Sequence, residues 1–206
     1  MSKSKSSRQW LDRHVNDEYV KRAQLEGYRS RAAFKLLEIQ DQDRLIKPGM
    51  NIVDLGAAPG GWTQIAKKLV GNSGQVIALD ILPMEPIAGV EIIEGDFRED
   101  GPLNCLYEIL DGKPVDLVIS DIAPNVSGMT AVDQPRAIYL CELTLEFARE
   151  SLKPGGVMLV KLFQGAGSDQ YIKDVRSSFK KVIIRKPKAS RPRSREVYLV
   201  AKGYKL

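Results

Sequence analysis

Acidic side chains recur where short apolar runs of the chain end. Asp54, Asp80, Asp96 and Asp121 each lie at or just after the end of such a run. If these runs are parallel strands, the four carboxylates lie at one edge of a sheet, which is where open α/β sheets bind ligands. We expect Asp80 to accept hydrogen bonds from both hydroxyls of a ribose, and Asp96 to lie beside an adenine. Each acid taken alone also fits a turn or a helix cap.

A turn of small residues follows Asp54 and predicts a nucleoside site. Residues 54–62 read DLGAAPGGW, and Gly56, Gly60 and Gly61 let the backbone turn tightly and approach a ligand closely. The turn lacks the G-x-G-x-x-G pattern of dinucleotide binding, and the chain lacks the G-x-x-x-x-G-K-[ST] pattern of nucleotide hydrolysis. We therefore expect a compact cofactor made of a nucleoside and an amino acid. A purely structural role for the turn stays open at this point.

Two charged residues occupy positions where apolar side chains would be ordinary. Lys161 lies inside the apolar run 157–163, and lysine is rarely buried without a partner. It falls near the carboxyl end of this run, at the same predicted edge as Asp121. Glu196 opens another apolar run and shares a face with Tyr198 by the two-residue period of a strand. The alternatives are a Lys161 side chain that extends to water and an ion pair of Glu196 with nearby arginines.

Positive charge gathers at the two ends of the chain. Residues 1–50 carry eleven Lys/Arg against seven Asp/Glu, residues 51–170 eight against seventeen, and residues 171–206 twelve against two. The segment 186–195 alone holds five basic residues and no acid. If the fold brings the ends together, they form a positive face that can follow a phosphate backbone. A merely solvated loop, and a disordered tail over residues 1–9, are the alternatives.

The elements that must position these residues alternate regularly between strands and helices. Apolar runs predict strands at 51–55, 75–79, 90–93, 115–120 and 157–163. Helical patterns cover 63–70, 135–152 and 170–179, and another helix is expected to begin at a Ser30 N-cap. Strands that alternate with helices indicate a parallel sheet with helices on both faces. The last two strands, 181–185 and 196–201, have no helix between them and should form an antiparallel hairpin.

Several protein classes are disfavoured by the composition. No apolar run approaches the length of a membrane span, and the polar, basic start does not look like a secretory signal, so we expect a cytoplasmic protein. Two cysteines without a C-x-x-C pattern and one histidine argue against a disulfide framework or a zinc site. We expect no metal and no membrane partner, with a monomer as the default state.

Five segments together resemble the FtsJ-like 2′-O-ribose methyltransferases, in particular the bacterial enzymes that act on large-subunit ribosomal RNA. They are 28-YRSRAAFK-35, 54–62, 120-SDIAPN-125, 160-VKLFQG-165 and 190-SRPRSREVY-198, and they span nearly the whole chain. The resemblance implies a class I methyltransferase, Rossmann-like fold of seven mostly parallel strands with a C-terminal antiparallel hairpin. It predicts one catalytic domain over 28–206, preceded by a basic, partly flexible extension over 1–27.

The family's Lys-Asp-Lys-Glu tetrad falls here on Lys35, Asp121, Lys161 and Glu196. We expect Lys161 to take the proton of the ribose 2′-hydroxyl while the other three orient it. The implied cofactor is S-adenosyl-L-methionine, which leaves as S-adenosyl-L-homocysteine. The residues expected to bind it are Asp54, Gly56, Gly60, Gly61, Trp62, Asp80, Asp96, Phe97 and Asp121.

The implied substrate is a uridine of 23S ribosomal RNA within the large ribosomal subunit. The residues expected to contact RNA are Arg29, Arg31, Lys186, Lys188, Arg191, Arg193, Arg195 and Tyr198. Core packing is an equally good interpretation for Tyr198 and for Trp62. A transfer RNA substrate is the nearer alternative function, and a non-catalytic RNA-binding protein is the more distant one.

Overall fold

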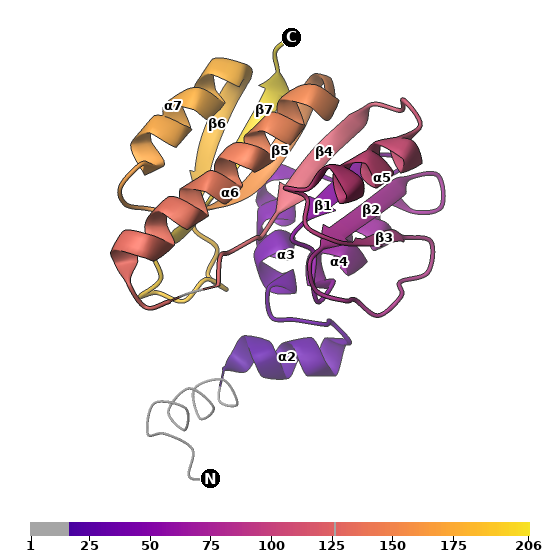
Figure 1. The fold of residues 1–206 in the computed structure, drawn as a ribbon. Helices are drawn as coiled ribbons and strands as arrows, with labels where there is room; N and C mark the ends of the chain where they lie inside the picture. Colours follow the sequence, from indigo (N-terminus) through magenta and orange to yellow (C-terminus); the bar gives the residue numbers. More distant parts are fainter. Residues whose placement is uncertain (1–16, 126) are drawn as a thin grey trace.

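A computed structural model describes residues 17–125 and 127–206 as one seven-stranded sheet covered by helices (Figure 1). The strand order is β3-β2-β1-β4-β5-β7-β6, and only β7 runs antiparallel to its neighbours. This arrangement confirms the predicted fold class. The strands are β1 Asn51–Leu55, β2 Gln75–Asp80, β3 Glu91–Glu94, β4 Val115–Ser120, β5 Leu152–Phe163, β6 Phe179–Arg185 and β7 Glu196–Tyr204.

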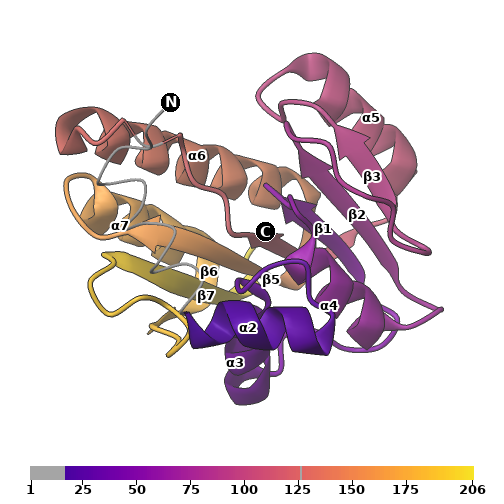
Figure 2. The same cartoon turned by 90° about the horizontal axis from the view of Figure 1, so that it is seen from below.

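The central strands are buried on both faces, which explains their almost continuous apolar sequence. One face packs against α5, α6 and α7, and the other packs against α3 and α4. Figures 1 and 2 show these two helical layers on opposite sides of the sheet. The helices are α2 Glu18–Glu26, α3 Ala33–Asp43, α4 Gly61–Val70, α5 Asp100–Leu110, α6 Thr130–Ser151 and α7 Ser168–Ser178.

Helix α2 lies within the extension predicted over 1–27. The Asp17 side chain caps its first turn by accepting the Tyr19 N–H at 3.0 Å, and Gly27 ends it with φ of 74°. The helix packs through Tyr19 and Ala23 against Phe34 of α3 (Figure 2). Residues 1–16 of the predicted extension lie outside the described residues.

The predicted helix starts were each off by two or more residues, since α4 and α7 begin two residues earlier than predicted. Helix α3 begins at Ala33 rather than after Ser30, because residues 30–35 first form turns in which the N–H groups of residues 33–35 each bond the carbonyl three residues earlier. The Ser30 hydroxyl does not cap the helix but packs against Gly61, where a Cβ would lie 2.5 Å from it. Helix α6 begins at Thr130, and Pro135 lies inside it rather than at its start. The Asp133 carboxylate stabilises this earlier start by accepting the backbone N–H groups of Ser127 and Gly128 at 2.8 and 3.0 Å.

Strand β5 starts directly after α6, five residues before its predicted start at Val157. The helix ends at Ser151, but residues 153–156 do not form the expected stop, because the backbone is already extended at Leu152, which pairs with Val115. The register shifts between Val115 and Leu117, as in a bulge.

Three negative findings apply to residues 17–125 and 127–206. None of their helices is long and apolar enough to cross a membrane. They contain no cluster of three or more His, Cys, Asp or Glu side chains suited to a metal ion. Cys105 and Cys141 are free thiols.

Candidate active site

The structure brings the four predicted tetrad residues together from four separate elements. Lys35 lies in the first turns of α3, Asp121 follows β4, Lys161 lies near the end of β5, and Glu196 opens β7. Lys161 Nζ is 3.0 Å from Asp121 Oδ1, and Lys35 Nζ is 3.0 Å from Glu196 Oε1 and 3.9 Å from Asp121 Oδ2. These contacts join the two lysines and the two carboxylates into one alternating chain of charge.

Strand pairing fixes half of this arrangement. In the antiparallel register of β5 and β7, Lys161 lies opposite Tyr198 and Phe163 lies opposite Glu196. Lys161 is 7% exposed, so its ammonium group depends on protein partners rather than on water. Besides the carboxylate, Lys161 Nζ donates to the Asp121 carbonyl oxygen at 2.5 Å. These partners exclude the alternative in which the side chain extends to water.

The two carboxylates of the tetrad stay ionised despite burial. Burial alone would raise the pKa of Asp121, but the charges of Lys161 and Lys35 and a 2.7 Å hydrogen bond from the Tyr198 hydroxyl lower it below the ordinary value. Burial opposes ionisation of Glu196 as well, and the charge and hydrogen bond of Lys35 again lower its pKa. At neutral pH the tetrad therefore presents two fixed negative charges between its lysines.

A cavity of about 480 Å³, here called the strand-end cavity, opens at the carboxyl ends of β1, β2, β3 and β4. Five of the predicted cofactor residues line it: Gly56, Asp80, Asp96, Phe97 and Asp121. Further side chains of its wall were not among the predicted cofactor residues, and they include Ile81, Leu82, Arg98, Ile122, Asn125, Arg136 and Tyr139. The signal for Ile122 and Asn125 was the segment 120–125, which follows the end of β4 and contains Asp121.

Backbone contacts hold the carboxylates of the strand-end cavity in place. Asp80 accepts the N–H groups of Ala58 and Leu82 at 2.9 and 2.8 Å, so it links the glycine turn to the loop after β2. Asp96 accepts Arg98 Nε at 2.8 Å, and the Arg98 guanidinium lowers the pKa of Asp96. The cavity therefore offers fixed acceptors to a ligand that carries hydroxyls, an amine or a positive centre.

Four predicted cofactor residues lie outside the wall of the strand-end cavity: Asp54, Gly60, Gly61 and Trp62. Trp62 is 3% exposed, and its indole N–H donates to the Ala32 carbonyl at 2.8 Å, which is the core-packing alternative. Gly61 is required where α4 meets Ser30. Asp54 is buried and accepts the Thr63 hydroxyl at 2.7 Å, and burial raises its pKa to about 7.

A second cavity of about 400 Å³, here called the loop cup, lies on the other side of the tetrad. It is formed between the start of α3 and residues 186–195, here called the basic loop. The tetrad residues Lys35 and Glu196 belong to its wall, whereas Asp121 belongs to the wall of the strand-end cavity. The described residues that line it are Arg31, Ala32, Lys35, Arg191, Arg193, Ser194 and Glu196.

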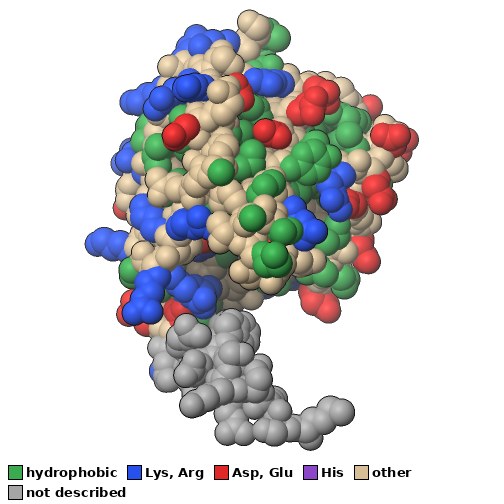
Figure 3. All heavy atoms as spheres, turned by 60° about the vertical axis from the view of Figure 1, so that its left-hand side comes forward, with side chains coloured by type: hydrophobic (Ala, Val, Ile, Leu, Met, Phe, Trp, Pro, Cys, Tyr) green, Lys and Arg blue, Asp and Glu red, His purple; other side chains and the backbone are tan. Residues whose placement is uncertain are grey.

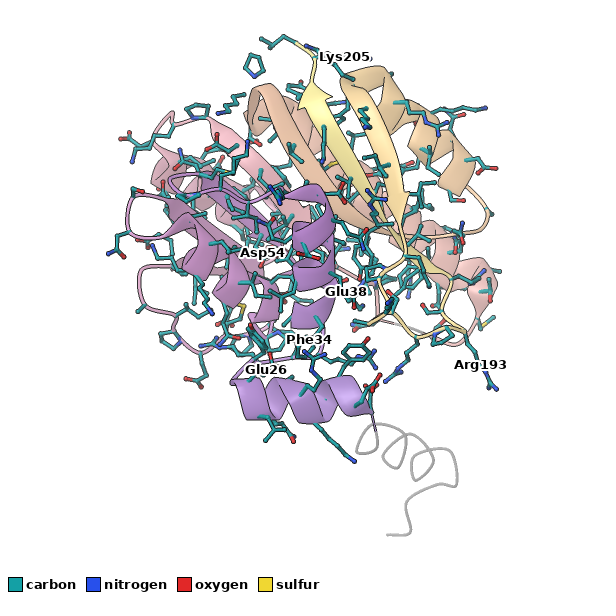
Figure 4. The ribbon with its side chains drawn as sticks, turned by 180° about the vertical axis from the view of Figure 1, so that it is seen from behind. Glu26, Phe34, Glu38, Asp54, Arg193 and Lys205 are labelled. Atoms are coloured by element: carbon teal, nitrogen blue, oxygen red, sulfur yellow. The ribbon has the colours of Figure 1, made fainter. Side chains whose placement is uncertain are left out.

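The predicted RNA contacts fall into three groups. Arg31, Arg191 and Arg193 line the loop cup, while Lys188 and Arg195 are exposed on the basic loop. Figure 4 shows Arg193 at the end of the molecule near α2, opposite the end that holds Lys205.

The other three residues predicted to contact RNA make contacts within the protein instead. Arg29 donates to the carbonyl oxygens of Glu85 and Pro86 at 2.6 and 2.8 Å, and Lys186 donates to that of Glu196 at 2.6 Å. Tyr198 is fully buried beneath the tetrad, which agrees with the core-packing alternative.

Comparisons with known proteins agree with this geometry. Residues 28–204 match the model of the family described as FtsJ-like methyltransferase. The chain is 60% identical to Ribosomal RNA large subunit methyltransferase E of Stutzerimonas stutzeri, over all of both chains. It is 62% identical to the protein of the same name from Alkalilimnicola ehrlichii, over 97% of this chain and 96% of the relative.

A solved structure also shares the fold. It is described as a candidate ribosomal RNA methyltransferase from Plasmodium falciparum, and it superposes with a TM-score of 0.75 at 30% identity. The match covers 86% of this chain and 98% of that one. Since the family model spans most of the sequence and the close relatives span all of it, the chain belongs to the FtsJ-like methyltransferase family.

Proposed function

We propose that the protein transfers a methyl group from S-adenosyl-L-methionine to a ribose 2′-hydroxyl of large-subunit ribosomal RNA. The observation that carries this proposal is the position of the tetrad between two unlike cavities. The acid-lined strand-end cavity reaches it through Asp121, and the arginine-lined loop cup reaches it through Lys35 and Glu196. A positively charged cofactor and a polyanionic substrate can thus meet at the tetrad, one from each cavity.

The strand-end cavity fits the cofactor by its chemistry. Asp80 would bind the ribose hydroxyls, Asp96 and Phe97 would border the adenine, and the small turn at Gly56 leaves room for the amino-acid part. When bound, the cofactor supplies a methyl group already activated by its sulfonium centre. The protein then has to position the acceptor in line and remove its proton.

The tetrad supplies that proton acceptor. Lys161 accepts the proton of the ribose 2′-hydroxyl as a general base, which requires its neutral amine. The ammonium that pairs with Asp121 therefore has to release its own proton to solvent before this step. Asp121 fixes the Lys161 amine by contacts at 2.5 and 3.0 Å from its carbonyl and carboxylate oxygens. Lys35 is fixed against Glu196 and faces the loop cup, where it orients the incoming ribose.

The relatives' names favour ribosomal RNA over transfer RNA as the substrate. We propose the large ribosomal subunit as the partner, a uridine as the target, and a monomer in the cytoplasm as the working form. A non-catalytic RNA-binding role is disfavoured because all four tetrad residues are present and in contact.

The test is transfer of a tritiated methyl group to large ribosomal subunits from cells that lack this protein. Free ribosomal RNA and transfer RNA serve as parallel substrates. We expect label in the subunits, recovered as an alkali-resistant 2′-O-methyl nucleotide. Label on transfer RNA alone would overturn the substrate, and cofactor binding without transfer to any RNA would overturn the proposed activity.

A further inference from the structure

The loop cup concentrates positive charge that its own acids do not balance. Among residues 17–125 and 127–206, the one acidic residue of its lining is Glu196, which is already paired with Lys35 at 3.0 Å. Arg31 is paired with Asp17 of the α2 cap. Among the residues that the structure describes, no acid lies within ion-pair distance of Arg191 or Arg193. Two guanidinium groups at this rim are therefore available to an anion.

The arginines of the loop cup also crowd one another. The pKa of Arg31 is lowered first by burial and next by the positive charge of Arg191. Like charges held together raise the free energy of the folded protein unless an anion binds between them. A phosphate suits such a cluster, because two of its oxygens can accept hydrogen bonds from the paired N–H groups of one planar guanidinium.

The cup is built before any ligand arrives. Glu38 of α3 accepts the backbone N–H groups of Lys188 and Ala189 at 2.6 and 2.9 Å, which fixes the first half of the basic loop. Lys186 Nζ donates to the carbonyl oxygens of Ser194 and Glu196 at 2.7 and 2.6 Å, which ties the second half. Such preorganisation lowers the entropy lost when a ligand binds.

The position of the cup relative to the tetrad identifies the phosphate. Lys35 and Glu196 belong to the tetrad and also line the loop cup. The cup therefore begins beside the residues where the 2′-hydroxyl is proposed to react. In RNA the 3′-phosphate is attached to the carbon next to the one that carries the 2′-hydroxyl. We propose, building on the function proposed above, that the loop cup binds the 3′-phosphate of the nucleotide being methylated, through Arg191 and Arg193.

The test compares uridine 3′-monophosphate with uridine 5′-monophosphate, titrated calorimetrically into the full chain saturated with S-adenosyl-L-homocysteine. We expect the 3′-isomer to bind more tightly. Changing both Arg191→Gln and Arg193→Gln should weaken it about tenfold, as expected for loss of charge-assisted hydrogen bonds. The same two substitutions should weaken binding of uridine 5′-monophosphate by less than half of that tenfold factor.

The matched control is Lys188→Gln, which removes a charge from the same loop but outside the cup. Its affinity for uridine 3′-monophosphate should stay within about twofold of the parent, since an exposed charge beyond the cup is screened by salt. Equal weakening by Lys188→Gln, equal affinity for the two isomers, or no detectable binding of the 3′-isomer would each overturn the cup as a phosphate site.

Methyl transfer to ribosomal subunits, measured alongside, separates this inference from the proposed function. Normal transfer by the parent together with arginine-independent mononucleotide binding refutes the cup and leaves the activity standing. Arginine-dependent binding of the 3′-isomer without transfer to any RNA supports the cup and refutes the activity.

Discussion

The two cavities that meet at the tetrad are built in opposite ways. The strand-end cavity is walled by the ends of parallel strands, and the acids of its wall, Asp80, Asp96 and Asp121, outnumber its two arginines. The loop cup is walled by a helix start and the basic loop, and its polar groups are mostly arginines. On the face of the molecule seen in Figure 3, most Lys and Arg side chains lie toward the left and many Asp and Glu side chains lie toward the right. Each side suits a ligand of opposite charge, and the tetrad, with both signs, lies at their boundary.

Replacing Lys161, which belongs to the tetrad between the two cavities, should have the largest effect on turnover. Lys161→Met keeps the apolar stem in the sheet but removes the proton acceptor, and we expect turnover to fall by 10³- to 10⁴-fold, about 4–5.5 kcal/mol. Single-turnover methyl transfer at saturating RNA measures it. Affinity for S-adenosyl-L-methionine should be nearly unchanged, which shows that the variant is folded. Turnover near the parent's value would remove Lys161 from the chemistry.

Two strand-end acids, the half-buried Asp121 and the fully buried Asp54, sharpen the contrast between the tetrad and the core. Asp121 has cationic partners and a lowered pKa. Asp54 accepts the Thr63 hydroxyl, has no cationic partner among the described residues, and has a pKa that burial raises to about 7. Between pH 4 and 7 the unfolded chain ionises at Asp54 and the folded chain does not. The contribution of Asp54 to the free energy of unfolding therefore falls by roughly 3–4 kcal/mol across that range and then levels off.

Asp54→Asn removes this decline, so the variant should gain stability relative to the parent as pH rises from 4 to 8. Urea denaturation at both pH values, with the variant and parent side by side, measures the difference. A constant difference at the two pH values would show that Asp54 is already ionised in the folded protein.

Asp80 tests the strand-end cavity alone. Asp80→Asn removes the charge and one acceptor from the ribose site, and we expect the Kd for S-adenosyl-L-methionine to rise about 30-fold, near 2 kcal/mol. Calorimetry measures this Kd, and filter binding at fixed salt measures RNA affinity, which should not fall. Equal losses for both ligands would mean that the two sides are not independent.

Glu38 tests the basic loop through its backbone contacts. Glu38→Gln removes a negative charge, which by electrostatics alone would strengthen RNA binding. We expect a loss of about fivefold instead, near 1 kcal/mol, because the N–H groups of Lys188 and Ala189 lose their carboxylate acceptor. Filter binding at one salt concentration measures it. Glu26→Gln on α2 is the matched control for charge, and tighter binding by both variants would contradict a positioning role.

The sequence predicted the framework well because the central strands leave an unambiguous pattern. Runs buried on both faces, such as β1 and β4, read as apolar, and the acids that follow them fall at one edge by topology. Lys161 could be predicted as a site residue because a lysine inside such a run needs a partner, and Asp121 was predicted at the same edge of the sheet. The antiparallel hairpin followed from two strands without an intervening helix.

The features that the sequence did not predict depend on contacts between segments, and such contacts leave no pattern in the local sequence. In the sequence Arg29 looks like an exposed cation, but its guanidinium donates hydrogen bonds to carbonyl oxygens more than 50 residues away. Trp62 follows a cofactor turn but packs into the core beside Tyr198, with ring centroids 5.7 Å apart. The start of α6 was missed because Pro135 favours a first-turn position, while the contacts of Asp133 outweigh that preference.

The position of strand β7 in the sheet determines when the active site forms during synthesis of the chain. It is the last of the described strands in the sequence, yet it lies between β5 and β6 rather than at an edge. A nascent chain that lacks it leaves one edge of β5 unpaired and has neither Glu196 nor the Tyr198 hydroxyl beneath Asp121. The methyltransferase site therefore closes only after residues 196–204 have been synthesised, so a chain that stops before Glu196 would be catalytically inactive.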